Sequence, residues 1–352
     1  MLEIYAGTNA LKTIQEQGFK QELFSTMLGA SGGPKWFSLF GLDKYLFGEF
    51  FKHRTTELNL VGSSAGAFRF AALSQADPVA AITRLAQHYS ETVYSKNANA
   101  AEITAKAREL LNNVYGFDGI QQIIDNPIFK AHFIVARCQG LTSYETKPLQ
   151  LLGLLTSVIL NKIDRGLLRH QYQRVVFHHP NSQLTLHDKH NFNTQYQMLT
   201  SENLSDALLA SGSIPLVMQG IKNINGCEQG MYRDGGIIDY HFDCALKPNN
   251  GLTLYPHFNA QPKAGWFDKN SSRKVNSKYY SNTIMLVPSE KFINQLPFQK
   301  IPDRKDFTEM DAATRIKYWK AVLAATDYLA EALDKMINQP ERLNSKLKLF
   351  RV

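Results

Sequence analysis

Short apolar runs alternate along this chain with longer segments of helical period, and this alternation restricts the folds it can adopt. The runs are short enough for buried strands, whereas the segments between them repeat apolar residues at a spacing near 3.6. Strands that alternate with helices form a mainly parallel sheet with helices on both faces. We therefore predict a three-layer α/β/α fold. The expected strands are Phe24–Leu28, Leu58–Val61, His132–Ala136, Arg174–Phe177, Gly251–Tyr255 and Thr283–Val287, and the expected helices are Phe37–Phe47, Ala67–Leu73, Val79–Tyr94 and Glu102–Asn112.

Three further segments differ from this alternation. Leu151–Leu160 has a wide apolar stripe at helical spacing, which we interpret as core packing, with a lid or membrane-touching helix as the alternative. Asp311–Met336 predicts a second long amphipathic helix. Gln261–Lys305 is rich in Pro, Asn, Ser and Lys and predicts extended surface loops.

A Gly-x-Ser-x-Gly motif from Gly62 to Gly66 lies between the expected strand Leu58–Val61 and the expected helix Ala67–Leu73. Such a strand–turn–helix unit holds the serine in a strained conformation that points its hydroxyl out of the sheet edge, and the flanking glycines avoid a steric collision. The N-terminus of the following helix adds a positive potential that favours an oxyanion. The context predicts that Ser64 is a nucleophile.

A second Gly-x-Ser-x-Gly pattern, from Gly29 to Gly33, follows the strand expected at Phe24–Leu28. Adjacent glycines after a strand expose backbone N–H groups in a concave turn, which can bind an anion or an oxyanion. On the pattern alone, Ser31 is an alternative nucleophile.

The same stretch approaches the phosphate-binding P-loop pattern as far as Lys35. Pro34 stands where a glycine N–H should face phosphate, and Trp36 stands where a hydroxyl should hold magnesium. These two differences exclude a nucleotide site of that kind.

Farther along, Asp234 directly precedes Gly235 and Gly236, a pattern that by itself is an ordinary turn signal. Upstream, the small residues of Ala210–Pro215 allow chain segments to approach closely.

In order along the chain, four blocks resemble the patatin-like phospholipase family, over about residues 1–260. They are a glycine-rich oxyanion loop ending in a basic residue, the serine turn, an Ala-Ser-rich segment ending in Pro, and the Asp-Gly-Gly motif.

The resemblance implies a role for each matching residue. Ser64, rather than Ser31, would be the nucleophile, and Asp234 would be its base in a dyad without histidine. The N–H groups of Gly32 and Gly33 would form the oxyanion hole. The supporting residues would be Lys35, which would orient the oxyanion loop, and Gly62, Gly66, Gly235 and Gly236.

The implied function is hydrolysis of a lipid acyl ester, of the phospholipase A or lysophospholipase type, through an acyl-enzyme intermediate and without a cofactor. A non-catalytic lipid-binding protein of the same fold, and an acyl-transferase or thioesterase with the same dyad, are the alternatives. The resemblance also divides the chain into a catalytic domain over residues 1–260 and, over residues 261–352, a basic loop region and C-terminal helical extension packed on it.

Three positions depart from the family pattern and bear on the range of substrates. Ser31 replaces the first glycine of the usual triplet. Trp36 stands where the family usually has glycine, which would narrow the mouth of the site. After Gly236, the chain reads Ile237 to His241 without the Asn and Pro often found there.

A histidine-containing triad is the rival to the dyad, because His241 and His257 follow the acid in the chain order Ser–Asp–His. Neither lies in a recognisable motif, so we interpret both as ordinary packing or surface residues. Four other histidines cluster without the spacing of a zinc site, and we predict no metal; they are His178, His179, His187 and His190.

The net charge of 39 − 31 = +8 is unevenly distributed, since residues 261–305 hold nine Lys or Arg against three acids. Such a basic stretch attracts anionic surfaces, and we expect lipid substrates and peripheral contact with an anionic membrane but no nucleic-acid partner.

Three widely spaced cysteines, Cys138, Cys227 and Cys244, suit a reducing compartment. Neither a secretory signal nor a membrane span is apparent, which predicts a cytoplasmic protein.

Overall fold

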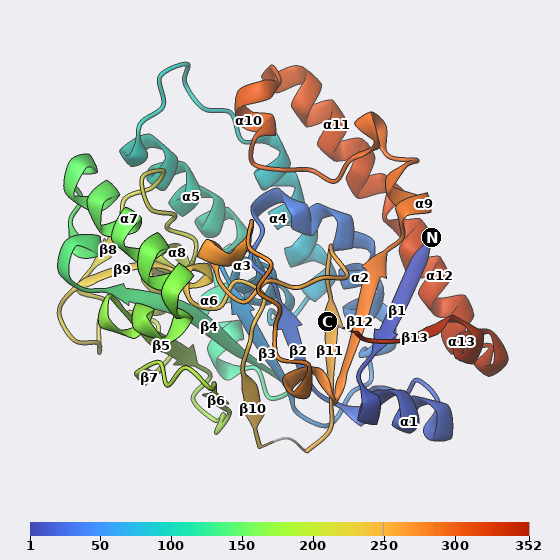
Figure 1. Cartoon of the computed structure of the whole chain (residues 1–352). Coiled ribbons are helices and arrows are strands. Elements are labelled where there is room, and N and C mark those ends of the chain that lie inside the picture. The colour runs from blue at the N-terminus through green and yellow to red at the C-terminus, as the bar shows by residue number, and fades with distance from the viewer. Residues whose placement is uncertain (249, 352) are drawn as a thin grey trace.

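The computed structural model describes residues 1–248 and 250–351 and contains a large mixed sheet (Figure 1). Among these residues the sheet has 11 strands; nine follow the order β13-β1-β12-β11-β2-β3-β4-β5-β7, while β9 pairs with β4 and β8. The strands from β12 to β4 are parallel neighbours, whereas β1 and β5 run antiparallel to β12 and β4. β6 and β10 form a separate pair. The strands are β1 (Leu2–Ala6), β2 (Phe24–Gly29), β3 (Leu58–Ser63), β4 (Phe129–Cys138), β5 (Tyr172–His178), β6 (Thr185–His187), β7 (Thr194–Met198), β8 (Ile221–Lys222), β9 (Met231–Asp234), β10 (Ala245–Lys247), β11 (Leu252–Pro256), β12 (Thr283–Pro288) and β13 (Leu347–Leu349).

Helices flank this sheet, and the predicted α/β fold with a mainly parallel sheet is confirmed (Figure 1). All six expected strands are present, as β2, β3, β4, β5, β11 and β12. Within the described residues, no helix is long and apolar enough to cross a membrane. The helices are α1 (Thr8–Gln17), α2 (Phe40–Tyr45), α3 (Ala65–Leu73), α4 (Pro78–Glu91), α5 (Ala100–Tyr115), α6 (Gly119–Asp125), α7 (Lys147–Ile163), α8 (Leu204–Ser211), α9 (Glu290–Ile293), α10 (Asp306–Glu309), α11 (Ala312–Ala325), α12 (Asp327–Ile337) and α13 (Pro340–Lys346).

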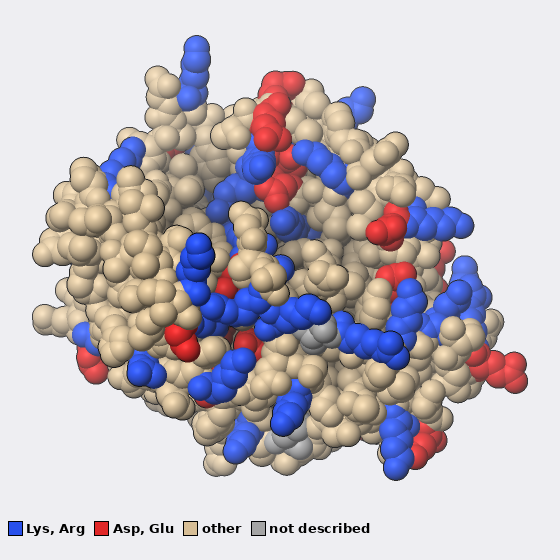
Figure 2. All heavy atoms as spheres, in the orientation of Figure 1, with Lys and Arg blue, Asp and Glu red and all other residues tan. Residues whose placement is uncertain are grey.

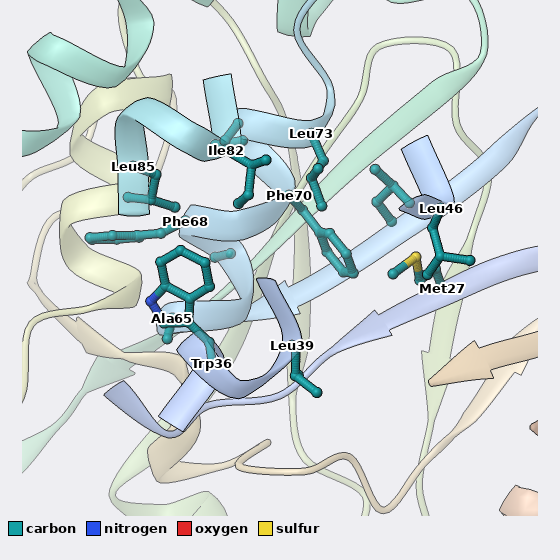
Figure 3. Close-up of a cluster of buried hydrophobic side chains, with 14 of the residues drawn as sticks. Met27, Trp36, Leu39, Leu46, Ala65, Phe68, Phe70, Leu73, Ile82 and Leu85 are labelled. Atoms are coloured by element: carbon teal, nitrogen blue, oxygen red, sulfur yellow. The ribbon is translucent and has the colours of Figure 1, made fainter. Parts of the chain in front are cut away.

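One face of the sheet carries the largest hydrophobic core, between the strands and α2, α3 and α4. Figure 3 shows part of it, with Phe68 and Phe70 of α3 beside Ile82 and Leu85 of α4. Every residue of α3 is buried, so this helix is enclosed by the sheet on one side and by other helices on the other. The helix that follows the serine turn is therefore held rigidly.

The opposite face is covered by α7 and by long irregular segments. Val61, Ile134 and Val176 of the sheet pack there against Tyr280 and other buried residues of the segment between β11 and β12. The prediction that Gln261–Lys305 forms extended surface loops is therefore wrong for the part before the expected strand Thr283–Val287. The apolar residues there are too widely spaced to show a period, yet they fill this face.

The C-terminal helical region forms two helices where one was predicted. α11 and α12 meet at Thr326, whose hydroxyl accepts a hydrogen bond from the Gly41 N–H and donates one to the Leu323 carbonyl oxygen. The segment Phe37–Phe47 also differs from a single α-helix, because it combines a 3₁₀ turn over Gly33–Leu39, α2 and a π turn over Leu46–Phe50.

The prediction that the apolar stripe of α7 packs in the core is wrong. Among the stripe residues only Leu154 is buried, and the other five are exposed: Leu151, Leu152, Leu155, Val158 and Ile159. The helix is amphipathic as predicted, but its small and polar residues face the protein. The spacing of the apolar residues correctly predicted a helix, but the face that it predicted to be buried is the exposed one.

Strand register brings two distant parts of the chain together. β3 runs along one edge of β4 and ends at Ser63, opposite Ile134. β5 pairs with the opposite edge of β4. Beyond the end of β3, β9 pairs with the same edge of β4 that β3 occupies, and β9 ends at Asp234, opposite Val135. The ends of β3 and β9 thus meet at neighbouring positions of β4, which brings Ser64, the residue after β3, close to Asp234, the last residue of β9.

Candidate active site

Ser64 has a strained backbone at the turn between β3 and α3. Its φ of 54° and ψ of −122° lie in a region that side chains other than glycine rarely adopt. The Ser64 N–H donates a hydrogen bond of 2.9 Å to Ser211 Oγ, which in turn donates one of 2.7 Å to the Ile134 carbonyl oxygen. The turn is therefore tied to α8 and β4, and these contacts offset the strain.

Glycine is required next to this serine because α3 lies directly on the backbone of β2. A Cβ atom placed on Gly66 would lie 1.9 Å from the Gly29 carbonyl oxygen, and one placed on Gly62 would lie 2.5 Å from the Gly66 carbonyl oxygen. Gly235 is similarly confined, with a Cβ position 2.1 Å from the Ile134 carbonyl oxygen. Since each obstacle is backbone, no side chain could move aside.

The side chains of Ser64 and Asp234 are in direct contact. Ser64 Oγ donates a hydrogen bond of 2.9 Å to Asp234 Oδ2, and both residues are buried. The other carboxylate oxygen, Oδ1, accepts 2.7 Å from the Gly236 N–H, which fixes the orientation of the carboxylate. Burial raises the pKa of Asp234, although this hydrogen bond, Ser64 and the nearby Arg304 oppose the rise.

The predicted oxyanion loop lies beside this pair. Gly33 has a φ of +56°, which favours glycine, and Gly32 lines a small cavity together with Ser64 and Asp234. Across the described chain, neither Gly32 nor Gly33 N–H donates a hydrogen bond to another protein group. Two free donors at this turn can stabilise a negative oxygen.

Lys35 lies at the end of the same loop and forms an ion pair of 3.2 Å with Asp303. Its ammonium group is also 5.7 Å from the ring centroid of Phe258, the ring that packs against Gly32. Lys35 thus connects the oxyanion loop to the C-terminal region, which agrees with a supporting role.

Ser31, the alternative nucleophile, is 1% exposed. Its hydroxyl donates to the Ser63 carbonyl oxygen at 3.2 Å and lies 3.1 Å from Ser63 Oγ. Its N–H donates to the Tyr240 carbonyl oxygen. In this position Ser31 holds the oxyanion loop against the turn before Ser64.

Trp36 does not narrow the mouth of the site, contrary to our expectation. It is 1% exposed and lies in the core beside Ala65 and Phe68, with its ring centroid 4.8 Å from that of Phe37 (Figure 3). The 3₁₀ turn after Gly33 directs this large side chain inward, which the family pattern did not indicate.

The two histidines of the rival triad are buried behind the oxyanion loop, against each other. Their ring centroids are 4.3 Å apart, and His241 Nδ1 accepts a hydrogen bond from the Lys263 N–H. Burial lowers the pKa of His257 to about 3 and lowers that of His241 well below its ordinary value. In the described part of the chain, neither ring is hydrogen-bonded to Ser64 or Asp234.

The histidine cluster predicted not to bind metal is spread over β5 and the segments after it. His178 Nδ1 lies 2.9 Å from the His179 carbonyl oxygen, and His187 Nε2 lies 3.0 Å from Thr185 Oγ1. Throughout residues 1–248 and 250–351, no group of three or more His, Cys, Asp or Glu side chains is placed to hold a metal ion.

A larger apolar cavity of about 420 Å³ opens from Ser64 toward α4 and α5. Its walls combine aromatic and aliphatic side chains from both sides of the serine turn. They include Phe68, Tyr89, Ile103, Leu110, Val217, Met218 and Phe307. The cavity can accept a long apolar group whose reacting end lies at Ser64.

Two basic residues at the same site were not singled out from the sequence. Arg304 lines both the apolar cavity and the small cavity, and Lys269 lines the small one. The Lys269 ammonium group is 4.4 Å from the ring centroid of Tyr240 and 5.4 Å from that of Trp266. Neither cation forms an ion pair with a carboxylate in the described structure, and no local sequence signal distinguished them from the other basic residues of this segment.

The sequence model described as patatin-like phospholipase matches residues 58–241, which are 184 of 352 residues. The chain belongs to the patatin-like phospholipase family. This match covers the serine turn and the Asp-Gly-Gly motif, whereas the oxyanion loop and the two cations of this patatin-like protein lie outside it.

Among solved structures, the chain is similar to VipD from Legionella pneumophila, with 11% identity and a TM-score of 0.32, over 68% of this chain and 51% of that one. It is also similar to the human GIVD cytosolic phospholipase A2, with 9% identity and a TM-score of 0.36, over 98% of this chain and 66% of that one. The patatin-like chain therefore spans about half the length of the VipD chain. No curated protein matches it.

Proposed function

We propose that this protein hydrolyses a lipid acyl ester of the phospholipid or lysophospholipid class, with Ser64 as nucleophile and Asp234 as general base. The observation that carries the proposal is the 2.9 Å hydrogen bond between two buried side chains, at the end of an apolar cavity of about 420 Å³. A buried carboxylate in contact with a serine hydroxyl can accept its proton directly.

The geometry supports a two-step reaction. Ser64 Oγ attacks the ester carbonyl while its proton passes to Asp234 Oδ2, and the N–H groups of Gly32 and Gly33 bind the oxyanion. The leaving alcohol takes the proton from Asp234, which leaves an acyl ester on Ser64. Asp234 then takes a proton from water as the hydroxide adds to that ester, and collapse of the second oxyanion returns the proton to Ser64 Oγ and releases the fatty acid.

The cavities favour a phosphate-bearing lipid over a neutral glyceride. Arg304 and Lys269 line the small cavity beside Ser64, a cavity with a volume of only about 10 Å³. An anionic head group would therefore lie at its mouth and pair with these two cations, which have no carboxylate partner in the described structure. The acyl chain would occupy the apolar cavity beyond Phe68. The same cations would draw the protein to anionic membrane surfaces.

Incubation of the protein with a mixed lipid extract tests the proposal, with products identified by mass spectrometry. We expect free fatty acids and lyso or fully deacylated phospholipids, absent with Ser64→Ala. Release of acyl groups only onto an added alcohol or amine acceptor would indicate a transferase, and binding of lipid without product would indicate the non-catalytic alternative.

A further inference from the structure

The helix α7 has its two faces reversed relative to a helix on the surface of a soluble protein. The buried residues, which repeat at helical spacing, are Gln150, Gly153, Leu154, Ser157 and Asn161. All but one of them are small or polar. An amphipathic helix normally buries its apolar stripe and exposes the polar one.

Hydrogen bonds hold the polar face of α7 to the protein. Ser157 Oγ lies 2.8 Å from Tyr172 Oη, and Gln150 Oε1 accepts 2.7 Å from the Leu216 N–H. Asn161 Nδ2 donates 2.8 Å to Asp268 Oδ1. These specific bonds fix the rotation of the helix about its axis.

The outward face of α7 is consequently apolar. Six large aliphatic residues are between 48% and 71% exposed: Leu151, Leu152, Leu155, Val158, Ile159 and Ile163. Exposed apolar side chains gathered on one helix face mark a surface that contacts an apolar partner. α7 contains no acidic residue, and both of its lysines, Lys147 and Lys162, are exposed.

The helix α7 lies next to the mouth of the Ser64 site, and its buried polar face is bonded to segments that line the small cavity. Gln150 near the start of α7 holds Leu216, the residue after the cavity-lining Ile214 and Pro215. Asn161 near its end holds Asp268, which precedes the cavity-lining Lys269. Figure 2 shows a mostly uncharged surface at the left, where α7 lies, beside a band of Lys and Arg across the middle.

We propose that the exposed face of α7 docks on a lipid surface and thereby brings the mouth of the Ser64 site to membrane lipids. The choice of this partner rests on the proposed function and on charge, because an apolar helix face with a lysine near each end, on a helix without acidic residues, complements an anionic bilayer. Apolar side chains enter the acyl boundary while the lysines contact head groups.

Sedimentation with vesicles of equal parts phosphatidylcholine and phosphatidylserine tests the docking without requiring catalysis. We expect wild type to bind, and the double variant Leu155→Ser with Ile159→Ser to lose at least about tenfold in partition coefficient. Tyr328→Ser, at a 59% exposed aromatic residue of α12, is the matched control and should bind as wild type does. Binding to pure phosphatidylcholine should be weaker.

Two further measurements complete the test: tryptophan emission reports docking without catalysis, and a ratio of two activities cancels any loss of folded protein. Ile159→Trp should show a blue shift of tryptophan emission when vesicles are added, beyond any shift in wild type. The ratio of vesicle-lipid to soluble-ester hydrolysis should fall in the double variant. Wild type that does not bind vesicles, or a double variant that binds equally well, would overturn the docking proposal. A double variant that changes only a dimer to a monomer would assign the face to a second copy of this chain instead.

Discussion

At the residue scale, the hydroxyl proton of Ser64 faces a single hydrogen-bonding acceptor in the described part of the chain, the Asp234 carboxylate. The carboxylate is also fixed by the Gly236 N–H, so its position does not depend on a bound substrate. The two candidate histidines lie elsewhere and are held neutral by burial. A two-residue proton transfer is therefore the mechanism that this geometry supports.

Asp234→Asn keeps the shape of the side chain but removes its ability to accept the proton. We expect kcat for a soluble ester to fall about a thousandfold or more, with the double variant Asp234→Asn, Ser64→Ala little worse than either single one. His241→Ala and His257→Ala should cost far less. A histidine variant that matched the loss at Ser64 would replace the dyad with a triad.

The wild-type pH profile follows from the same carboxylate. Because burial raises the pKa of Asp234 and only the ionised form accepts a proton, activity should fall as the pH drops through that raised pKa. The midpoint of the acid limb should therefore lie above about 4, the ordinary value for aspartate. A midpoint below that value would contradict a buried carboxylate base.

The two unpaired cations should set the preference for the head group. Arg304→Gln and Lys269→Gln should each raise KM for a lysophospholipid about tenfold and leave KM for a monoacylglycerol nearly unchanged, because a charge-assisted contact to phosphate is lost. Lys305→Gln, next to Arg304 but exposed, is the control. An equal effect on both substrates would remove the cations from head-group recognition.

At the element scale, the sequence predicted those features that depend on local spacing. The strand, glycine turn and helix around Ser64 were predicted from adjacent residues, because the steric requirement acts within a few positions. The segment α7 was predicted as a helix but with the wrong face inward, since the hydrogen bonds that fix its rotation reach Tyr172 and Asp268. Arg304 and Lys269 also reach the site through tertiary packing, which no local pattern encodes.

The close contact of α3 with β2 gives a stability test at the same scale. Gly66→Ala would place a Cβ atom 1.9 Å from a backbone oxygen, so we expect the free energy of unfolding to fall by about 3 kcal/mol or more. Gly116→Ala, where nothing lies within 4 Å of the added Cβ atom and only the backbone conformation (φ 60°, ψ −140°) opposes alanine, should cost less, about 2 kcal/mol. Similar losses in urea denaturation would show that the α3–β2 contact can relax.

At the scale of the whole molecule, the C-terminal region contributes to the sheet as well as covering it. β12 lies between β1 and β11, and residues before and after it supply Lys269 and Arg304. A boundary near residue 260 remains our prediction for the extent of the catalytic motifs.

A chain that ends at residue 260 should not fold by itself. Its loss of β12 would separate β1 from the sheet and expose the apolar edge at β11. A chain that ends at Gln339 loses only α13 and the edge strand β13 and should fold. Circular dichroism and cooperative thermal unfolding distinguish these results, and a cooperative transition of the shorter chain would show that residues 261–352 are dispensable for folding.

Covalent labelling of the folded protein with a fluorophosphonate, followed by peptide mapping, tests most directly whether Ser64 is the nucleophile. We expect one modified serine, Ser64, with labelling abolished in Ser64→Ala and retained in Ser31→Ala, because Ser31 is buried and bonded to Ser63. Labelling of Ser31 instead, or an unlabelled Ser64 in protein that hydrolyses esters, would contradict the assignment of Ser64 as the nucleophile.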